Sequence, residues 1–354
     1  MPETMRALVL REWGGPLLLE KRPLPRPGPD EVLVRVVACG VGDTLNNMSS
    51  GRNAALPGVE LPRVLGHEVA GVVAEVGADV EGVAPGQRVA VSMYLTCGRC
   101  DLCRWGHDPL CRSLRGLVGM SLDGGLADYL AVPAANVHAV PEGVSALEAA
   151  VTVDAVASPW HALRAVARLG PTEVVVVVGA GGGVGVHAVK VGKLLGAHVI
   201  GVDVTEAKLA FARSQGADQV VDGRGQVAGE VLRATGGRGA DVVVDYVASE
   251  STLRAALEGL GPDGRLVVQG VGPEGAELRL PPRALIQRQL AVAGSRYASR
   301  REVAEALDLV RRGAVRPAVT RTVPLERTEE LFDLIARREL LGRGAVIVAP
   351  DEQW

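Results

Sequence analysis

The sequence predicts an α/β protein with two domains, one β-rich and barrel-like and one built on a doubly wound parallel sheet. The chain has 354 residues, enough for two domains that each bury a core. Its first part reads as short β segments separated by Gly and Pro. From about Ala146 onward, helical stretches alternate with valine-rich runs, which is typical of a parallel sheet covered on both faces.

The elements expected in each part follow from these patterns. In the first part, the expected strands are Arg6–Leu10, Glu31–Ala38, Glu68–Val76, Arg88–Met93 and Leu126–Val132. In the second part, they are Glu173–Val178, His198–Val202, Asp241–Asp245 and Leu266–Gln269. A helix at Arg301–Arg311 and a strand at Gly344–Ala349 come last, and this strand could complete the first domain. We therefore expect one domain from residues 1–152 and 299–354, and the other from 153–298.

Composition and charge limit the partners of this protein. The formal net charge is −3, which argues against nucleic-acid binding. No apolar span of about 18 residues is present, and the N-terminus lacks a basic patch followed by an apolar run. We expect a cytoplasmic protein that acts on small molecules, without a nucleic-acid or membrane partner.

A glycine-rich turn after the strand at Glu173–Val178 indicates a nucleotide site. A Cβ in such a turn would keep a pyrophosphate away from the backbone amides and from the positive N-terminus of the next helix. A flexible loop is the alternative, but here the turn lies between a buried strand and a helix. The residues expected to bind the coenzyme are Gly179, Gly181, Gly182, Gly183 and Val184.

Asp203 ends the next predicted strand, about twenty residues past the glycines, where a carboxylate can accept hydrogen bonds from ribose hydroxyls. Its charge would repel a 2′-phosphate, so NAD is favoured over NADP. Lys208 could reach the same ribose. Alternatively, Asp203 only caps a helix and Lys208 is a solvated helix residue.

Four cysteines with the spacing C-x2-C-x2-C-x7-C indicate a metal site. They are Cys97, Cys100, Cys103 and Cys111. Four thiolates on a short loop match a closed tetrahedral zinc site, which leaves no position for water or substrate. In a reducing compartment such a cluster is more often a metal site than a set of disulfides. We expect one structural zinc.

The cysteine spacing, the glycine-rich unit and the segment that begins Gly66-His67-Glu68 together resemble the zinc-containing medium-chain dehydrogenase/reductase family (alcohol dehydrogenase-like) over essentially the whole chain. The resemblance implies a GroES-like catalytic domain from both chain ends, a Rossmann coenzyme domain between them, and chemistry in the cleft where they meet. It also implies NAD(H)-linked hydride transfer on an alcohol/carbonyl pair. Relatives associate through their coenzyme domains, so a homodimer or homotetramer is expected.

In relatives that oxidise alcohols, a second zinc in the cleft acts as a Lewis acid on the alcohol oxygen. His67 matches the histidine ligand of that zinc, Glu68 the alternate ligand, and Asp154 the third ligand. Thr44 matches the residue whose hydroxyl passes the substrate proton. As alternatives, His67 and Glu68 could be a structural pair, and Asp154 a plain helix residue.

The chain departs from the family at the first zinc ligand. Relatives typically read C-G-V-C-H-T-D, whereas this chain places Gly42 where the second cysteine would stand. Cys39 matches a cysteine that is not a ligand. Either the remaining ligands, with Asp43 swung inward, hold a weaker zinc, or no catalytic metal binds. The second case suits an ene-reductase, because an α,β-unsaturated carbonyl or thioester spreads its developing charge without a strong Lewis acid.

A protein that binds NAD without turnover is a further alternative, and its nicotinamide contacts would be expected to erode. Here they are present. The residues that match family contacts to the nicotinamide half are Val247, Gly270, Val271, Gly294 and Ser295. Arg343, which precedes the closing strand, resembles a pyrophosphate contact; the alternative is a surface charge.

Overall fold

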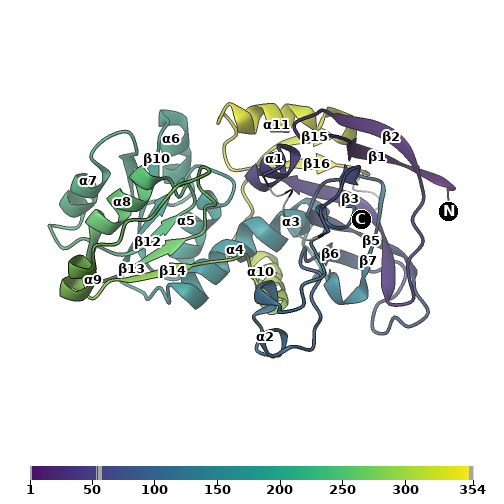
Figure 1. The fold of residues 1–354 in the computed structure, drawn as a ribbon, viewed down its shortest axis with the longest axis horizontal. Helices are drawn as coiled ribbons and strands as arrows, with labels where there is room; N and C mark the ends of the chain where they lie inside the picture. Colours follow the sequence, from purple (N-terminus) through teal and green to yellow (C-terminus); the bar gives the residue numbers. More distant parts are fainter. Residues whose placement is uncertain (1, 53, 55–57, 351–353) are drawn as a thin grey trace. The chain divides into compact units, whose positions relative to one another are not determined.

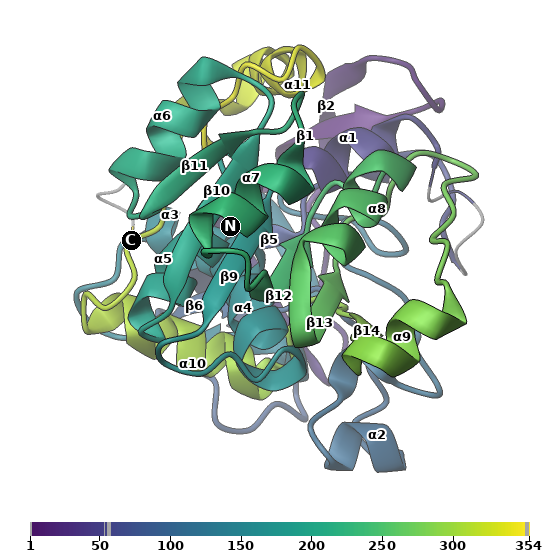
Figure 2. The same cartoon turned by 90° about the vertical axis from the view of Figure 1, so that its left-hand side faces the viewer.

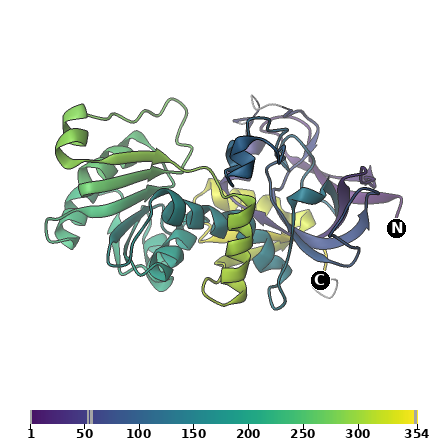
Figure 3. The same cartoon turned by 90° about the horizontal axis from the view of Figure 1, so that it is seen from below.

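The computed structural model describes residues 2–52, 54, 58–350 and 354 (Figure 1). Unit 1 comprises Met1–Asp154 and Ala298–Trp354, and unit 2 comprises Ala155–Tyr297. The predicted α/β class is confirmed, because unit 1 is dominated by antiparallel strands and unit 2 by a parallel sheet with helices. Both chain ends belong to unit 1, as Figure 3 shows.

Unit 1 is built on two β-sheets. A three-stranded sheet has the order β2-β1-β4, and a seven-stranded sheet runs β15-β16-β3-β5-β6-β8 with β7 paired to β3. The strands are β1 (Thr4–Leu10), β2 (Leu17–Pro23), β3 (Glu31–Val41), β4 (Arg63–Val64), β5 (Glu68–Val76), β6 (Arg88–Val91), β7 (Tyr129–Pro133), β8 (Val137–Ala139), β15 (Val319–Pro324) and β16 (Arg343–Ile347). Strand β16 pairs antiparallel with β3, so the C-terminal segment belongs to the large sheet of unit 1.

The helices of unit 1 are short, except α10. They are α1 (Asp43–Ser49), α2 (Asp101–Arg104), η1 (Asp108–Leu110), η2 (Ala134–Asn136), α3 (Ala146–Val151), η3 (Thr152–Val156), α10 (Arg300–Arg311), η5 (Leu325–Arg327) and α11 (Glu329–Ala336). Helix α3 packs against β3, β5 and β16 and continues into the π-helical η3, which spans the boundary between the units. This continuation positions Asp154 beside the large sheet.

Unit 2 holds a six-stranded parallel sheet with the order β11-β10-β9-β12-β13-β14 (Figure 2). Its strands are β9 (Val174–Val178), β10 (His198–Asp203), β11 (Gln219–Asp222), β12 (Ala240–Asp245), β13 (Leu260–Val268) and β14 (Ala291–Gly294). Its helices are α4 (Ala157–Trp160), η4 (His161–Val166), α5 (Gly185–Leu194), α6 (Glu206–Ser214), α7 (Val227–Ala234), α8 (Glu250–Gly259) and α9 (Pro282–Arg288). Among the described residues, no helix combines the length and apolar character needed to cross a membrane.

The strand order explains why the glycine turn lies where it does. Strand β9 is a run of five buried valines, as a strand covered on both faces requires. The order reverses between β9 and β12, and ligands of such sheets bind at the carboxyl ends of the strands at this switch point. The turn after β9 therefore opens the expected binding edge.

Some expected boundaries were wrong. The strand expected at Leu126–Val132 forms at Tyr129–Pro133, and the one expected from Leu266 already begins at Leu260. The sequence patterns also missed the strands β2, β4, β8, β11, β14 and β15. Most residues of β2 are exposed and β14 has no buried residue, so neither strand leaves a clean alternation in the sequence.

His138 on β8 gives unit 1 a predictable pH dependence. Burial, followed by the charge of Arg300, lowers the pKa of His138 to about 4, and Asp108 partly opposes the shift. In the unfolded chain the imidazole keeps its ordinary pKa near 6.5, so the unfolded state binds the proton first as pH falls. Stability from this group is complete above about pH 6.5 and should fall by roughly 2–3 kcal/mol toward pH 4.

The variant His138→Gln isolates this effect. The free energy of unfolding of both proteins is measured in urea at pH 7.5 and at pH 4.5. Between these two pH values, wild type should lose more stability than His138→Gln. Equal losses would show that His138 does not carry the effect.

Candidate functional site

Strand pairing brings Glu68 and Arg343 together at the end of β3. Glu68, the first residue of β5, pairs with Gly40 of β3. Gly344 of β16 pairs with Val41 of the same strand, and Arg343 directly precedes it. Residues 275 positions apart therefore meet because β5 and β16 flank one strand.

The three candidate metal ligands meet in the interior of unit 1. His67 and Glu68 are fully buried and Asp154 is 4% exposed. His67 Nε2 and Asp154 Oδ2 lie 3.2 Å apart, within hydrogen-bond distance. One ligand atom from each of the three residues lies within 4.8 Å of the others. The structure thus gathers the side chains that the family resemblance selected.

Arg343 lies in the interior of unit 1, beside Glu68. Its side chain is buried, and its Nε donates to Glu68 Oε2 at 3.1 Å while Nη2 donates to Glu68 Oε1. The same Nη2 lies 3.8 Å from Asp154 Oδ2. Two buried carboxylates need a compensating cation, and Arg343 supplies it. The surface-charge alternative is therefore wrong, whereas the pyrophosphate contact stays a prediction.

Two glycines make room for this ion pair. A Cβ on Gly40 would lie 1.8 Å from Glu68 Oε2, and a Cβ on Gly42 would lie 1.8 Å from Arg343 Nη1. The backbone of Gly42 is extended, with φ −150°, a conformation open to any residue. Gly42 is therefore required for space, since the guanidinium lies where a side chain at this position would begin.

Burial also tunes the two ionisable groups beside these glycines. Full burial raises the pKa of Glu68 to about 7, and the positive charge of Arg343 is the largest influence opposing that rise. Burial likewise raises the pKa of the Cys39 thiol well above its ordinary value. Cys39 is thus a buried thiol, consistent with a packing role.

The other side chains near this position are less enclosed. Thr44 lies half-buried in the first turn of α1. Asp43, which could have swung inward as a substitute ligand, is exposed.

These residues do not fit a catalytic zinc in the observed arrangement. Gly42 offers no side-chain ligand, and the Glu68 carboxylate is already bound by a guanidinium. A divalent cation about 4 Å from that guanidinium would be repelled by on the order of 8 kcal/mol at an effective dielectric constant near 20. The guanidinium of Arg343 thus lies where a metal cation would have to bind.

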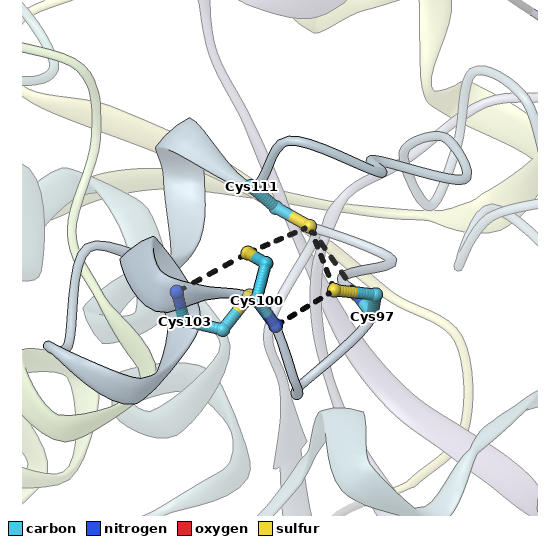
Figure 4. A group of neighbouring side chains, drawn as sticks. All are labelled: Cys97, Cys100, Cys103 and Cys111. Carbon is cyan, nitrogen blue, oxygen red and sulfur yellow. Dashed lines mark hydrogen bonds between the residues drawn. The ribbon is translucent and has the colours of Figure 1, made fainter.

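The four-cysteine lobe fits zinc well (Figure 4). The Sγ atoms of Cys97 and Cys111 lie 3.5 Å apart and those of Cys100 and Cys111 4.0 Å apart. Zn–S bonds of about 2.3 Å in a tetrahedron imply S–S separations of about 3.8 Å. Backbone N–H groups of Arg99 and Cys100 lower the pKa of Cys97 and so favour the thiolate. The lobe is a structural zinc site whose four ligands are all cysteines.

In unit 2, the glycine turn is fastened to the ends of two strands. Gly179 and Ala180 donate backbone hydrogen bonds to Val202 O at 2.8 and 3.0 Å. Asp203 Oδ2 accepts from the Gly181 amide at 2.9 Å, and Asp203 is buried. The carboxylate therefore holds the turn against β10.

Glycine is needed in this turn for close packing. A Cβ on Gly181 would lie 2.5 Å from the Cβ of Lys208. A Cβ on Gly185, the first residue of α5, would lie 2.1 Å from Gly179 O. A Cβ on Gly182 would come no closer than 3.3 Å to its nearest neighbour, so the tip of the turn is less crowded. Gly183 and Val184 lead directly into α5.

The residues expected on the nicotinamide side lie at the same edge of the sheet. Val247 and Gly270 follow β12 and β13, and their amides donate to Asp245 Oδ1 and Asp245 O. Ser295 follows β14 and donates its amide to Val268 O at 2.9 Å. Val247 and Val271 are 44% and 81% exposed, so this edge offers apolar surface.

Sequence reasoning missed Asp245. It is fully buried, and its Oδ1 accepts from the amides of Val247 and Ala248 at 2.8 Å, which shapes the turn after β12. An aspartate that ends a valine-rich strand was the available signal.

Comparisons with known proteins agree with this arrangement. Residues 28–142 match the family described as "Alcohol dehydrogenase GroES-like domain", and residues 183–312 match "Zinc-binding dehydrogenase". A relative named NAD-dependent alcohol dehydrogenase from Sulfurisphaera tokodaii is 37% identical over 97% of this chain and 100% of its own length.

Two solved structures extend the likeness to the whole fold. The crystal structure of AibC has a TM-score of 0.91 and 37% identity, covering 98% of this chain and 97% of its own. The alcohol dehydrogenase of the hyperthermophilic archaeon Aeropyrum pernix has a TM-score of 0.90 and 34% identity, covering 97% of this chain and 100% of its own.

Proposed function

Because this chain belongs to the zinc-containing medium-chain dehydrogenase/reductase family, we propose that it transfers hydride between NAD(H) and an alcohol/carbonyl pair. It is an NAD-dependent oxidoreductase of the alcohol dehydrogenase type, since relatives with that name match it over nearly its full length. The observation that carries the proposal is the carboxyl edge of the unit 2 sheet, where the glycine turn, Asp203 and the nicotinamide-side residues follow adjacent strands.

The chain's own residues would divide the work of coenzyme binding. The amides of the glycine turn and the N-terminus of α5 would bind the pyrophosphate. Asp203 would accept the adenosine ribose hydroxyls, with Lys208 beside it. The exposed apolar side chains of Val247 and Val271 would lie along the nicotinamide.

Substrate-side roles rest on unit 1. The Thr44 hydroxyl would pass the substrate proton, and donors such as this hydroxyl would stabilise negative charge on the substrate oxygen. The structural zinc folds its lobe and does no chemistry, because all four positions are cysteine sulfurs.

We predict that Asp203 determines the coenzyme preference. Asp203→Ala should lower kcat/KM for NADH by about 10- to 100-fold, the effect of losing hydrogen bonds to a charged acceptor. Activity with NADPH should fall less or rise, since the charge that repels a 2′-phosphate is gone. Steady-state kinetics with both coenzymes check this.

Two control variants separate the charge from the fold. Asp203→Asn keeps an oxygen for the Gly181 amide and removes only the charge, so it should shift the NADH-to-NADPH ratio in the same direction. Asp222→Ala removes an aspartate from the end of the neighbouring strand β11 and should leave the ratio unchanged. An unchanged ratio in Asp203→Asn would refute the electrostatic explanation.

A second candidate function is the reduction of an α,β-unsaturated carbonyl or thioester. The specific observation in its favour is the guanidinium of Arg343 next to Gly42, where relatives have a metal-binding thiolate. NADH oxidation should be followed with saturated aldehydes and ketones and, separately, with enones and enoyl thioesters, and the products identified by mass spectrometry. Alcohol products support the first proposal, saturated carbonyl products support the second, and no turnover of any of them contradicts both.

We also propose that the protein is a cytoplasmic homodimer or homotetramer, as expected from its relatives' mode of association. Light scattering of the purified chain measures the assembly directly. A monomer at micromolar concentration would overturn this part of the proposal.

A further inference from the structure

We propose that the guanidinium of Arg343 replaces a metal ion as the cation that holds His67, Glu68 and Asp154 together, so that this site works without a catalytic zinc. Arg343 would then be a positioning residue, which holds the two carboxylates in place. The inference concerns the site itself and holds whether the substrate is a saturated carbonyl compound or an activated alkene.

The first argument is charge. Two carboxylates lie in the interior with almost no exposure, and a buried charge requires a partner of opposite sign. One guanidinium binds Glu68 through Nε and Nη2 and places that Nη2 3.8 Å from Asp154. His67 adds its hydrogen bond to Asp154 at 3.2 Å. One cation thus faces both carboxylates, and His67 joins the cluster through Asp154.

The second argument is space. Gly42 stands at the position of the missing thiolate, and the atom nearest to a Cβ built there is Nη1 of Arg343, at 1.8 Å. A cysteine at this position and the guanidinium in this place exclude each other. Since the extended backbone at Gly42 would accept any residue, the absence of a side chain matches the presence of the guanidinium.

The third argument is that the sheet leaves space for Glu68 and fixes the positions of both partners. Gly40, two residues earlier, leaves the volume that the Glu68 carboxylate fills, because a Cβ there would lie 1.8 Å from Oε2. The register of β16 and β5 on either side of β3 fixes where both partners start. The ion pair is therefore built into the sheet.

A consequence for chemistry follows if the proposed hydride transfer is correct. A guanidinium bound to Glu68 cannot act as the Lewis acid that lowers the pKa of a bound alcohol, as zinc does. Charge on the substrate oxygen must then be met by hydrogen-bond donors, which favours substrates that spread this charge by conjugation. Both candidate reactions would then depend on such donors, and an activated double bond would need them least.

The test is the zinc content of the full-length protein, measured by mass spectrometry after equilibration with zinc chloride and removal of unbound metal. Wild type should hold about one zinc per chain, and Cys111→Ser should hold none. His67→Ala should leave the wild-type value unchanged. About two zincs in wild type, falling to one in His67→Ala, would overturn the proposal.

A gain-of-binding variant tests the same idea in the other direction. Gly42→Cys combined with Arg343→Ala restores the thiolate and removes the cation, and it should hold about two zincs per chain. With cobalt in place of zinc, both proteins should show the thiolate-to-metal absorption of the four-cysteine site. Only the double variant should show a further absorption from the thiolate at position 42. A folded double variant, checked by circular dichroism, that stays at one zinc would show that Arg343 does not exclude the metal.

These measurements do not depend on turnover. Failure of the hydride-transfer proposal would appear as absent NADH oxidation with an unchanged zinc count. Failure of the present inference would appear as a second zinc, whatever the activity. If the double variant does not fold, the wild-type and His67→Ala counts still decide the question.

Discussion

Replacing Cys111 by serine should remove the zinc from the protein and destabilise unit 1 by on the order of 5 kcal/mol. Structural zinc contributes roughly 10–16 kcal/mol to the folding of isolated zinc-finger peptides. Here part of the lobe is also held by contacts with the rest of unit 1, so a smaller loss is expected. Zinc content and the urea unfolding transition measure the two effects.

The lobe's own helices and exposed apolar side chains contribute little to its stability. Its helices α2 and η1 have four and three residues, far too few to be stable alone. Trp105 and Leu110 are 68% and 51% exposed, so they add little to a core. Without zinc, the four cysteines would be neighbouring thiols, and no metal would join the two ends of the loop.

Loss of the lobe should spread to α10. Asp108, in the lobe, accepts a hydrogen bond from the backbone N–H of Arg300 at 2.9 Å, the first residue of α10. Arg300 also donates to Ala135 O at 3.1 Å. Hydrogen exchange in the first turn of α10 should therefore rise in Cys111→Ser.

Cys39→Ala is the matched control. Cys39 is buried in β3 and is not part of the four-cysteine cluster, and its Sγ lies 3.7 Å from Gly40 O. This variant should keep its zinc and lose little stability. If Cys111→Ser kept both its zinc and its unfolding midpoint, the assignment of a structural zinc would be wrong.

The sequence predicted the elements with continuous apolar runs better than it predicted edge strands. Strand β9 is buried on both faces, and its run of five valines predicted it. Strand β11 lies at the edge of the same sheet, with only one buried residue, and offers no comparable signal. The start of β13 was hidden because Gly261 to Gly264 contain Gly, Pro and Asp, which read as a turn.

The residues of the candidate site also differ in how well the sequence predicted them. The four cysteines and the Gly66-His67-Glu68 segment are local in the sequence, so their spacing carried the signal. The partner of Arg343 was not local, because the ion pair depends on the register of two strands on either side of β3. The missing thiolate at Gly42 was visible in the sequence, whereas the group that fills its space was not.

Arg343→Met should destabilise unit 1 by about 3–5 kcal/mol, the usual cost of leaving one partner of a buried ion pair uncompensated. Glu68 is fully buried and loses the guanidinium that binds both of its oxygens. Methionine keeps much of the side-chain volume, so the loss reports charge more than packing. Urea unfolding at pH 8, followed by circular dichroism, measures it.

The combination of Arg343→Met with Glu68→Gln should recover part of this loss. Removing both charges of a buried pair is far less costly than removing one, so the double variant should be more stable than the sum of the two single changes predicts. Arg11→Met breaks the exposed pair with Glu20 and should change the unfolding free energy too little to resolve. Additive effects at positions 68 and 343 would mean that the guanidinium does not compensate Glu68. Recovery would instead show that the guanidinium compensates the buried charge of Glu68.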